Sequence, residues 1–182
     1  MDFKIKKTTP EKIKTDALIV PVFEGAVVGS SVDSLSEAAR DSLNTALKQG
    51  DIKGKAGDLQ ILGALPDTPA KRIVLMGLGK ASEQSASKLR KALVTTATAL
   101  TKTAAKDAAL LLDEIQIKDR DGQWLARQVV ELFSHACYRF NDYKSKDKQS
   151  KINLKKLTLL CDTDNKAVEE GIKIGSAVAN GM

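Results

Sequence analysis

The sequence predicts an α/β fold built on a mixed, mostly parallel sheet of about six strands, with helices on both faces. Short aliphatic runs near residues 20, 60, 75, 110 and 159 are typical of buried strands. Segments with helical spacing separate most of these runs, and a helical crossover favours a parallel pair. Aromatic residues make up only 4% of the chain, so its core has to be aliphatic.

The spacing of apolar residues places each element along the chain. It predicts strands at 3–6, 17–23, 59–65, 73–76, 108–112 and 157–161. The link between the third and fourth strands is short enough for an antiparallel pair. It predicts helices over about 34–49, 83–103, 122–139 and 166–182. Ser34 and Glu37 match a capping box at the first helix, and Gly50 is placed to end that helix.

The last predicted helix contains two interior glycines, Gly171 and Gly175. A glycine inside a helix costs about 1 kcal/mol relative to alanine, so we expect this helix to pack closely against another element. The sequence then ends without a polar tail, and we expect a piece of a longer protein. The expected organisation is a domain at 1–163 followed by a connecting helix at 164–182.

The stretch 71–80, KRIVLMGLGK, is the clearest junction in the sequence. An aliphatic run closed by Gly77 and Gly79 predicts a strand buried on both faces that stops in a tight turn. Backbone amides near a helix start attract anions, so Gly77, Gly79 and Lys80 are a candidate anion-binding turn. The alternative, which we favour, is a turn whose glycines supply a positive φ. Ser82 stands where a dinucleotide-binding fingerprint needs a third glycine.

Several segments together carry a resemblance to a known family. They are GLGK at 77–80, GDIKGKAG at 50–57, the final helix entering Gly175, and the spaced residues Tyr138, Phe140, Tyr143 and Lys144. In order and spacing they resemble the amino-terminal domain of the leucyl aminopeptidases, also called cytosol aminopeptidases, from end to end of this chain. The resemblance implies a macro-domain-like fold and a non-catalytic domain that serves assembly or regulation.

The resemblance also implies properties of a longer parent protein. That parent would be a leucyl aminopeptidase, a peptide hydrolase that releases amino-terminal residues and prefers leucine. It would use two divalent metal ions, zinc or manganese, bound in its own catalytic domain, which follows the present chain. The parent would be a homo-hexamer with these domains at its periphery.

Residues suited to catalysis or metal binding are scarce. His135 is the only histidine, and Cys137 and Cys161 are too far apart for a zinc motif or a CxxC pair. The Asn-Thr-Asp-Ala-Glu-Gly-Arg motif of the resembled peptidases is absent. We therefore assign no catalytic, cofactor-binding or metal-binding residue and no cofactor to this chain. Adjacent acidic residues such as Asp113 and Glu114 are expected on the solvated surface.

The net charge of +6 is concentrated in one segment. Residues 141–156 contain two aspartates and six lysines, at positions Lys144, Lys146, Lys148, Lys151, Lys155 and Lys156. These lysines are a candidate contact for nucleic-acid phosphates, and the aromatic residues just before them are suited to stacking on bases. A solvated loop with the aromatics holding the helix end is the alternative, and we favour it.

The sequence also bears on location and on rival functions. It begins without the apolar segment of a secretory signal, and its longest apolar run, 17–23, is too short to span a bilayer. We expect a cytoplasmic protein without a membrane partner. Two rivals to the aminopeptidase domain remain open. One is a stand-alone macro-like module that binds ADP-ribose or phosphate, and the other is a DNA-binding regulatory domain.

Overall fold

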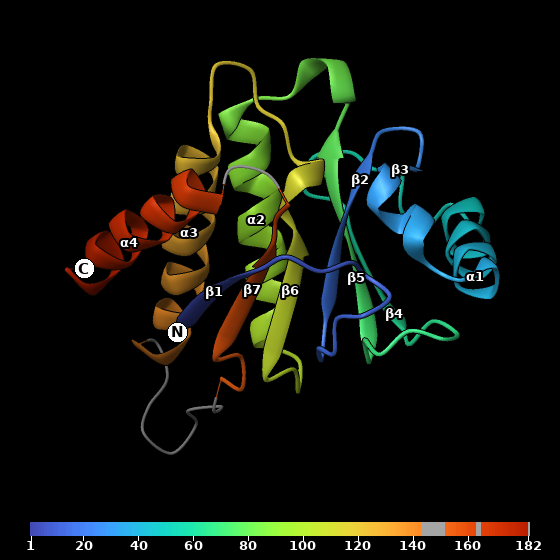
Figure 1. The fold of residues 1–182 in the computed structure, drawn as a ribbon, viewed down its shortest axis with the longest axis horizontal. Helices are drawn as coiled ribbons and strands as arrows, with labels where there is room; N and C mark the ends of the chain where they lie inside the picture. The colour runs from blue at the N-terminus through green and yellow to red at the C-terminus, as the bar shows by residue number, and fades with distance from the viewer. Residues whose placement is uncertain (143–151, 163–164, 182) are drawn as a thin grey trace.

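A mixed sheet organises the structure, a computed structural model that describes residues 1–142, 152–162 and 165–181. Its strands are β1 (Asp2–Lys6), β2 (Leu18–Phe23), β3 (Val27–Val28), β4 (Leu59–Gly63), β5 (Arg72–Gly79), β6 (Asp107–Leu111) and β7 (Lys156–Leu160). They lie in the order β1-β7-β6-β2-β5-β4, and β3 pairs with β2 (Figure 1). The pairs are parallel except β4 with β5 and β3 with β2. The predicted mixed, mostly parallel sheet and its antiparallel pair are confirmed.

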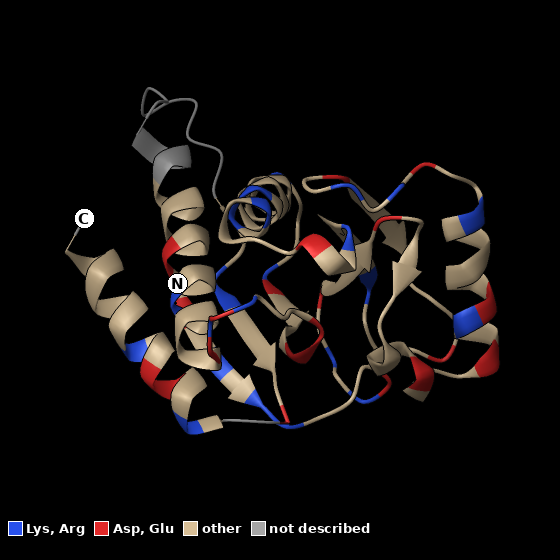
Figure 2. Ribbon diagram, turned by 90° about the horizontal axis from the view of Figure 1, so that it is seen from above, with Lys and Arg blue, Asp and Glu red and all other residues tan. Residues whose placement is uncertain are grey.

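Helices cover both faces of this sheet, as predicted. They are α1 (Glu37–Lys48), α2 (Ala86–Thr101), α3 (Gly122–Asp142) and α4 (Asn165–Asn180), with short 3-10 helices η1 (Ser30–Ser34), η2 (Ala81–Glu83) and η3 (Leu112–Glu114). α1 packs on one face, and α2 and α3 pack on the other. Figure 2 shows α3 and α4 together at one end of the molecule and α1 at the opposite end.

The alternation of side chains along β2 divides the core into two layers. Leu18 and Val20 face the layer that contains α1, whereas Ile19 faces the layer that contains α2 and α3. All three side chains are fully or almost fully buried. A strand buried on both sides has to be central, and β2 lies between β6 and β5.

Two helices begin later than the sequence predicts. Ser36, not Ser34, caps α1, because its hydroxyl accepts a hydrogen bond from the Ala39 N–H at 3.2 Å. Ser34 instead ends η1, so the predicted capping box is wrong. Ser85 caps α2 in the same way through the Lys88 N–H at 3.3 Å. Gly50 follows α1 with φ +82°, which confirms its expected role at the helix end.

The two glycines of α4 allow it to lie directly against α3. A Cβ added at Gly171 would overlap the Gln123 carbonyl oxygen, and one at Gly175 would lie 2.8 Å from the Val130 Cβ. Both glycines are buried. The close packing expected for the last helix is therefore confirmed, and α3 is its partner.

Candidate functional site at the carboxyl ends of the strands

The glycines that close β5 belong to the strand and not to a turn after it. β5 continues through Gly79, so the predicted end at residue 76 is wrong. Segment 54–58 lies alongside this part of the strand, and the two backbones are very close. A Cβ at Gly77 would overlap the Lys55 carbonyl oxygen and lie 2.9 Å from the Asp58 Cβ. Gly77 is therefore required for close approach of two backbones, whereas Gly79 supplies the expected positive φ of +87°.

The glycine amides of the candidate anion-binding turn donate hydrogen bonds to segment 54–58. The Gly77 N–H donates to the Asp58 carbonyl oxygen at 2.8 Å, and the Gly79 N–H donates to the Gly54 carbonyl oxygen at 2.7 Å. The Lys80 ammonium lies 3.3 Å from a carboxylate oxygen of Glu83. An anion at this position would have to displace bonds that the domain already makes, so anion binding there stays a prediction without structural support.

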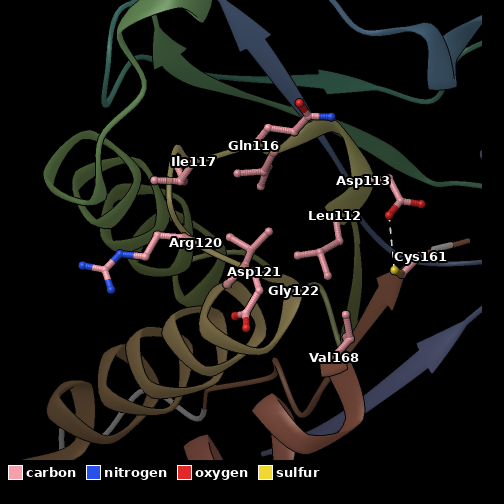
Figure 3. Close-up of a pocket in the computed structure, with 11 residues that line it drawn as sticks. Leu112, Asp113, Gln116, Ile117, Arg120, Asp121, Gly122, Cys161 and Val168 are labelled. Atoms are coloured by element: carbon pink, nitrogen blue, oxygen red, sulfur yellow. Dashed lines mark hydrogen bonds between the residues drawn. The ribbon is translucent and has the colours of Figure 1, made fainter. Parts of the chain in front are cut away.

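A pocket of about 360 Å³ lies at the carboxyl ends of β6 and β7, beside the first turns of α3 and α4 (Figure 3). Leu112, Ile115, Ile117, Leu125 and Val168 provide its apolar lining. Ligands of open α/β sheets bind at this end of the strands, which makes it a candidate binding site. The dashed line in Figure 3 marks the Cys161 Sγ–H donating to Asp113 Oδ1 at 3.2 Å. Arg120 points away from that pair.

The acidic residues at this edge bind backbone amides of neighbouring loops. Asp113 Oδ2 accepts from the Asp162 N–H at 2.6 Å, which joins the segments that follow β6 and β7. Asp121 Oδ1 accepts from the Trp124 N–H at 2.8 Å at the start of α3. Glu114 Oε1 accepts from the Ser31 N–H at 2.6 Å, which joins the segments that follow β6 and β2. Asp113 is exposed, as expected, and Glu114 is half-buried, but both carboxylates also bind backbone amides of distant segments.

The Glu114 contact lies at the carboxyl ends of the neighbouring strands β2 and β6. The chain leaves these two strands in opposite directions, toward β5 and toward β7, so this is a switch point of the sheet. Gly29 makes room for the contact, since a Cβ there would overlap the Glu114 carboxylate. Sequence reasoning missed this relationship because Glu114 and Ser31 are 83 residues apart and match no motif. The Ser31 amide is thus bonded to an internal carboxylate, at the edge of the sheet where ligands of open α/β folds bind.

The candidate metal ligands remain dispersed. Across residues 1–142, 152–162 and 165–181, no three His, Cys, Asp or Glu side chains come together as a metal site. His135 is partly buried on α3. Burial raises the pKa of the Cys137 thiol, which lies 3.7 Å from the Met1 sulfur. Neither cysteine is in a disulfide. These described residues do not fit the two-metal centre that the family resemblance implies for the parent.

The lysine-rich segment is described only at its end. Lys155 and Lys156 are exposed where β7 begins, whereas Lys144, Lys146, Lys148 and Lys151 lie outside the described residues. Tyr138 is 60% exposed on α3. Over the rest of the ribbon, basic and acidic residues are interspersed (Figure 2). The described part of the chain has no helix with the length and apolar character needed to cross a membrane.

Comparison with known proteins identifies the family. Residues 19–147 match the cytosol aminopeptidase family, N-terminal domain. The chain belongs to this family. It is 39% identical to the cytosol aminopeptidase of Pseudomonas aeruginosa over its full length but spans only 37% of that relative. It is 34% identical to a probable cytosol aminopeptidase of Chromobacterium violaceum and spans 35% of it.

Solved structures show the same fold at low sequence identity. A tomato leucine aminopeptidase mutant matches the whole chain with a TM-score of 0.74 at 21% identity, and the match covers 36% of that structure. The macro domain of ganglioside induced differentiation associated protein 2 matches 96% of the chain with a TM-score of 0.67 at 10% identity, and 84% of that domain is covered. The macro-domain-like architecture implied by the resemblance is therefore confirmed.

Proposed function

We propose that this chain is the non-catalytic amino-terminal domain of a leucyl aminopeptidase, which releases amino-terminal residues from peptides. The observation that carries this proposal is the family match over residues 19–147, together with relatives that are more than twice as long as this chain. The chemistry would belong to the remainder of the parent, because no cluster of metal ligands occurs in the described residues. The domain would act in assembly or regulation.

The parent would work in the cytoplasm with two divalent metal ions, zinc or manganese, held in its catalytic domain. Those ions would polarise the scissile carbonyl and activate the attacking water. The parent would assemble as a homo-hexamer with these domains at its periphery. Support for the location comes from the relatives, which are named cytosol aminopeptidases.

A direct assay tests whether peptidase activity requires the catalytic domain of the parent. The purified chain, supplied with manganese or zinc, is expected to release no leucine from leucine amide, whereas a polypeptide that includes the following domain is expected to do so. The readout is the amine released per mole of protein, with a preparation lacking added metal as the control. Turnover by the chain alone would contradict the proposal.

Nucleic-acid binding is a second candidate function, favoured by the exposure of Lys155 and Lys156 at the start of β7. Binding through phosphates would be independent of base sequence and would weaken steeply with salt. The test measures duplex DNA binding by the chain and by a variant with Lys144, Lys146 and Lys148 replaced by alanine. Weaker binding by the variant supports this function, and indifference to both salt and substitution removes it.

A further inference from the structure

A cleft lined mostly by charged residues lies at the opposite end of the sheet from the pocket described above. Its volume is about 530 Å³, and it is formed by the residues that lead into β2, β5 and β6. Four basic side chains, Lys14, Lys71, Arg72 and Lys106, line it together with two acidic ones. Ala104 is the only aliphatic side chain among its lining residues. The charged groups of this lining suit a charged ligand.

The two carboxylates of the cleft form hydrogen bonds and an ion pair with neighbouring residues of the same chain. Asp16 Oδ2 accepts from the Lys106 N–H at 2.8 Å, and its other oxygen lies 2.7 Å from the Lys71 ammonium. Asp107 Oδ1 accepts from the Asp16 N–H at 3.0 Å and from the Thr15 hydroxyl. These reciprocal bonds tie the start of β2 to the start of β6. They hold the floor of the cleft in one geometry before any ligand arrives.

Three of the four basic side chains lie beyond ion-pair distance of any carboxylate that the structure describes, although the charge of Arg72 still contributes to lowering the pKa of Asp16. Within the described residues, Lys14, Arg72 and Lys106 form no ion pair. The backbone of Lys155 lies beside that of Lys106, because the Lys155 N–H donates to the Lys106 carbonyl oxygen at 2.8 Å, but Lys155 does not line the cleft. The four basic residues outnumber the two acidic ones, and an excess of positive charge around a preformed cleft attracts a multivalent anion.

We propose that this cleft binds an anion that carries several phosphate groups. Lys14, Arg72 and Lys106 would hold its oxygens, with the planar Arg72 guanidinium able to bind one phosphate through two hydrogen bonds. A cleft of about 530 Å³ lies within the size range of small-molecule sites. The site is separate from the peptidase activity proposed above and requires no metal from the catalytic domain.

Calorimetric titration of the chain with sodium tripolyphosphate at low salt tests the proposal. We expect saturable binding to one site, weakened about fivefold or more by each of Lys14→Ala, Arg72→Ala and Lys106→Ala. Lys118→Ala is the matched control, because Lys118 is an exposed lysine outside the cleft. Circular dichroism verifies that each variant is folded. Lys14 and Lys106 are exposed, so their variants keep the test valid if Arg72→Ala unfolds.

Three results would overturn the proposal. One is the absence of saturable binding by the unchanged chain. Another is an equal loss of affinity in Lys118→Ala, which would indicate general attraction to a basic protein. The third is binding of an oligonucleotide that weakens in Lys14→Ala and Lys106→Ala but that tripolyphosphate does not displace, which would assign the cleft to nucleic acid. None of these results bears on the peptidase assay, so the two proposals fail independently.

Discussion

The Glu114 carboxylate bonds to the Ser31 amide at 2.6 Å and thereby joins the segments that follow strands β6 and β2. This contact lies at the switch point of the sheet, the place where open α/β sheets generally bind ligands. Gly29 is part of the same arrangement, since only a residue without a Cβ leaves space for the carboxylate. Glu114 is therefore a structural cross-link between two loops and not a solvated surface charge.

Removing this cross-link is expected to loosen the loop that carries Ser31. Glu114→Ala leaves the amide without its acceptor and should lower the free energy of unfolding by about 1–3 kcal/mol. Glu114→Gln keeps an acceptor oxygen and should lose less than half of that amount. Urea unfolding and hydrogen exchange at the Ser31 amide measure the effect. Equal stability of the alanine variant and the unchanged chain would contradict the assignment.

The bond between Glu114 and Ser31 also bears on the rival macro-like function. Because Glu114 already occupies the Ser31 amide, the unchanged chain is expected to give no saturable heat with ADP-ribose. Calorimetry is the measurement, and a macro domain with known ADP-ribose binding serves as the positive control. Saturable binding that is lost in a variant at this edge of the sheet would show that the contact opens and that the rival function is correct.

Close backbone approach at Gly77 makes a further prediction. Gly77→Ala forces a Cβ into the Lys55 carbonyl, so segment 54–58 or the strand has to shift. We expect a loss of stability of about 2 kcal/mol or more. Gly63→Ala is the matched control in β4, because no atom lies within 4 Å of its added Cβ. That control should change the stability by about 0.5 kcal/mol or less. Similar denaturation midpoints for the two variants would refute the packing explanation.

Replacing Gly171 by alanine has two opposing effects on stability, because this residue lies at the contact between α3 and α4. Alanine gains about 1 kcal/mol over glycine in helix propensity. Its Cβ would, however, overlap the Gln123 carbonyl oxygen and lie 2.9 Å from the Ala126 Cβ. We expect the clash to prevail, so that Gly171→Ala lowers the melting temperature. Gly181→Ala, whose Cβ would meet atoms only at 3.6 Å, should not. A raised melting temperature in Gly171→Ala would mean that α4 is free to move.

The lowered pKa of Asp16 predicts that the stability of the protein falls at acid pH. The hydrogen bond from Lys71 and the backbone bond from Lys106 lower the pKa of Asp16 below its ordinary value of 3.8. A lowered folded-state pKa stabilises the protein fully above pH 3.8, and this stabilisation is lost as pH falls through the lower folded-state pKa. Asp16→Asn should abolish this part of the acid sensitivity. Thermal unfolding between pH 2 and 7 measures it, and identical pH profiles for both proteins would contradict the prediction.

The sequence by itself determined the element types and the family. Aliphatic runs separated by helical spacing are local patterns, so the strands, their mostly parallel pairing and the helices on both faces followed from them. The two glycines of the last helix likewise predicted close packing. Their unfavourable helix propensity is a local property that the sequence shows directly. The segments around 50–57 and 77–80 carried a family resemblance that the match over residues 19–147 confirms.

Only the tertiary structure decided what occupies the two ends of the sheet. The sequence indicated a turn at Gly77, because a single sequence does not show that segment 54–58 packs directly against this residue. Asp113 and Glu114 lie toward the surface, but their hydrogen bonds were not foreseen, because their amide partners belong to distant segments. The cleft of basic residues likewise combines the starts of three strands. Contacts between residues far apart in the chain depend on the packing of whole elements, and local periodicity does not encode that packing.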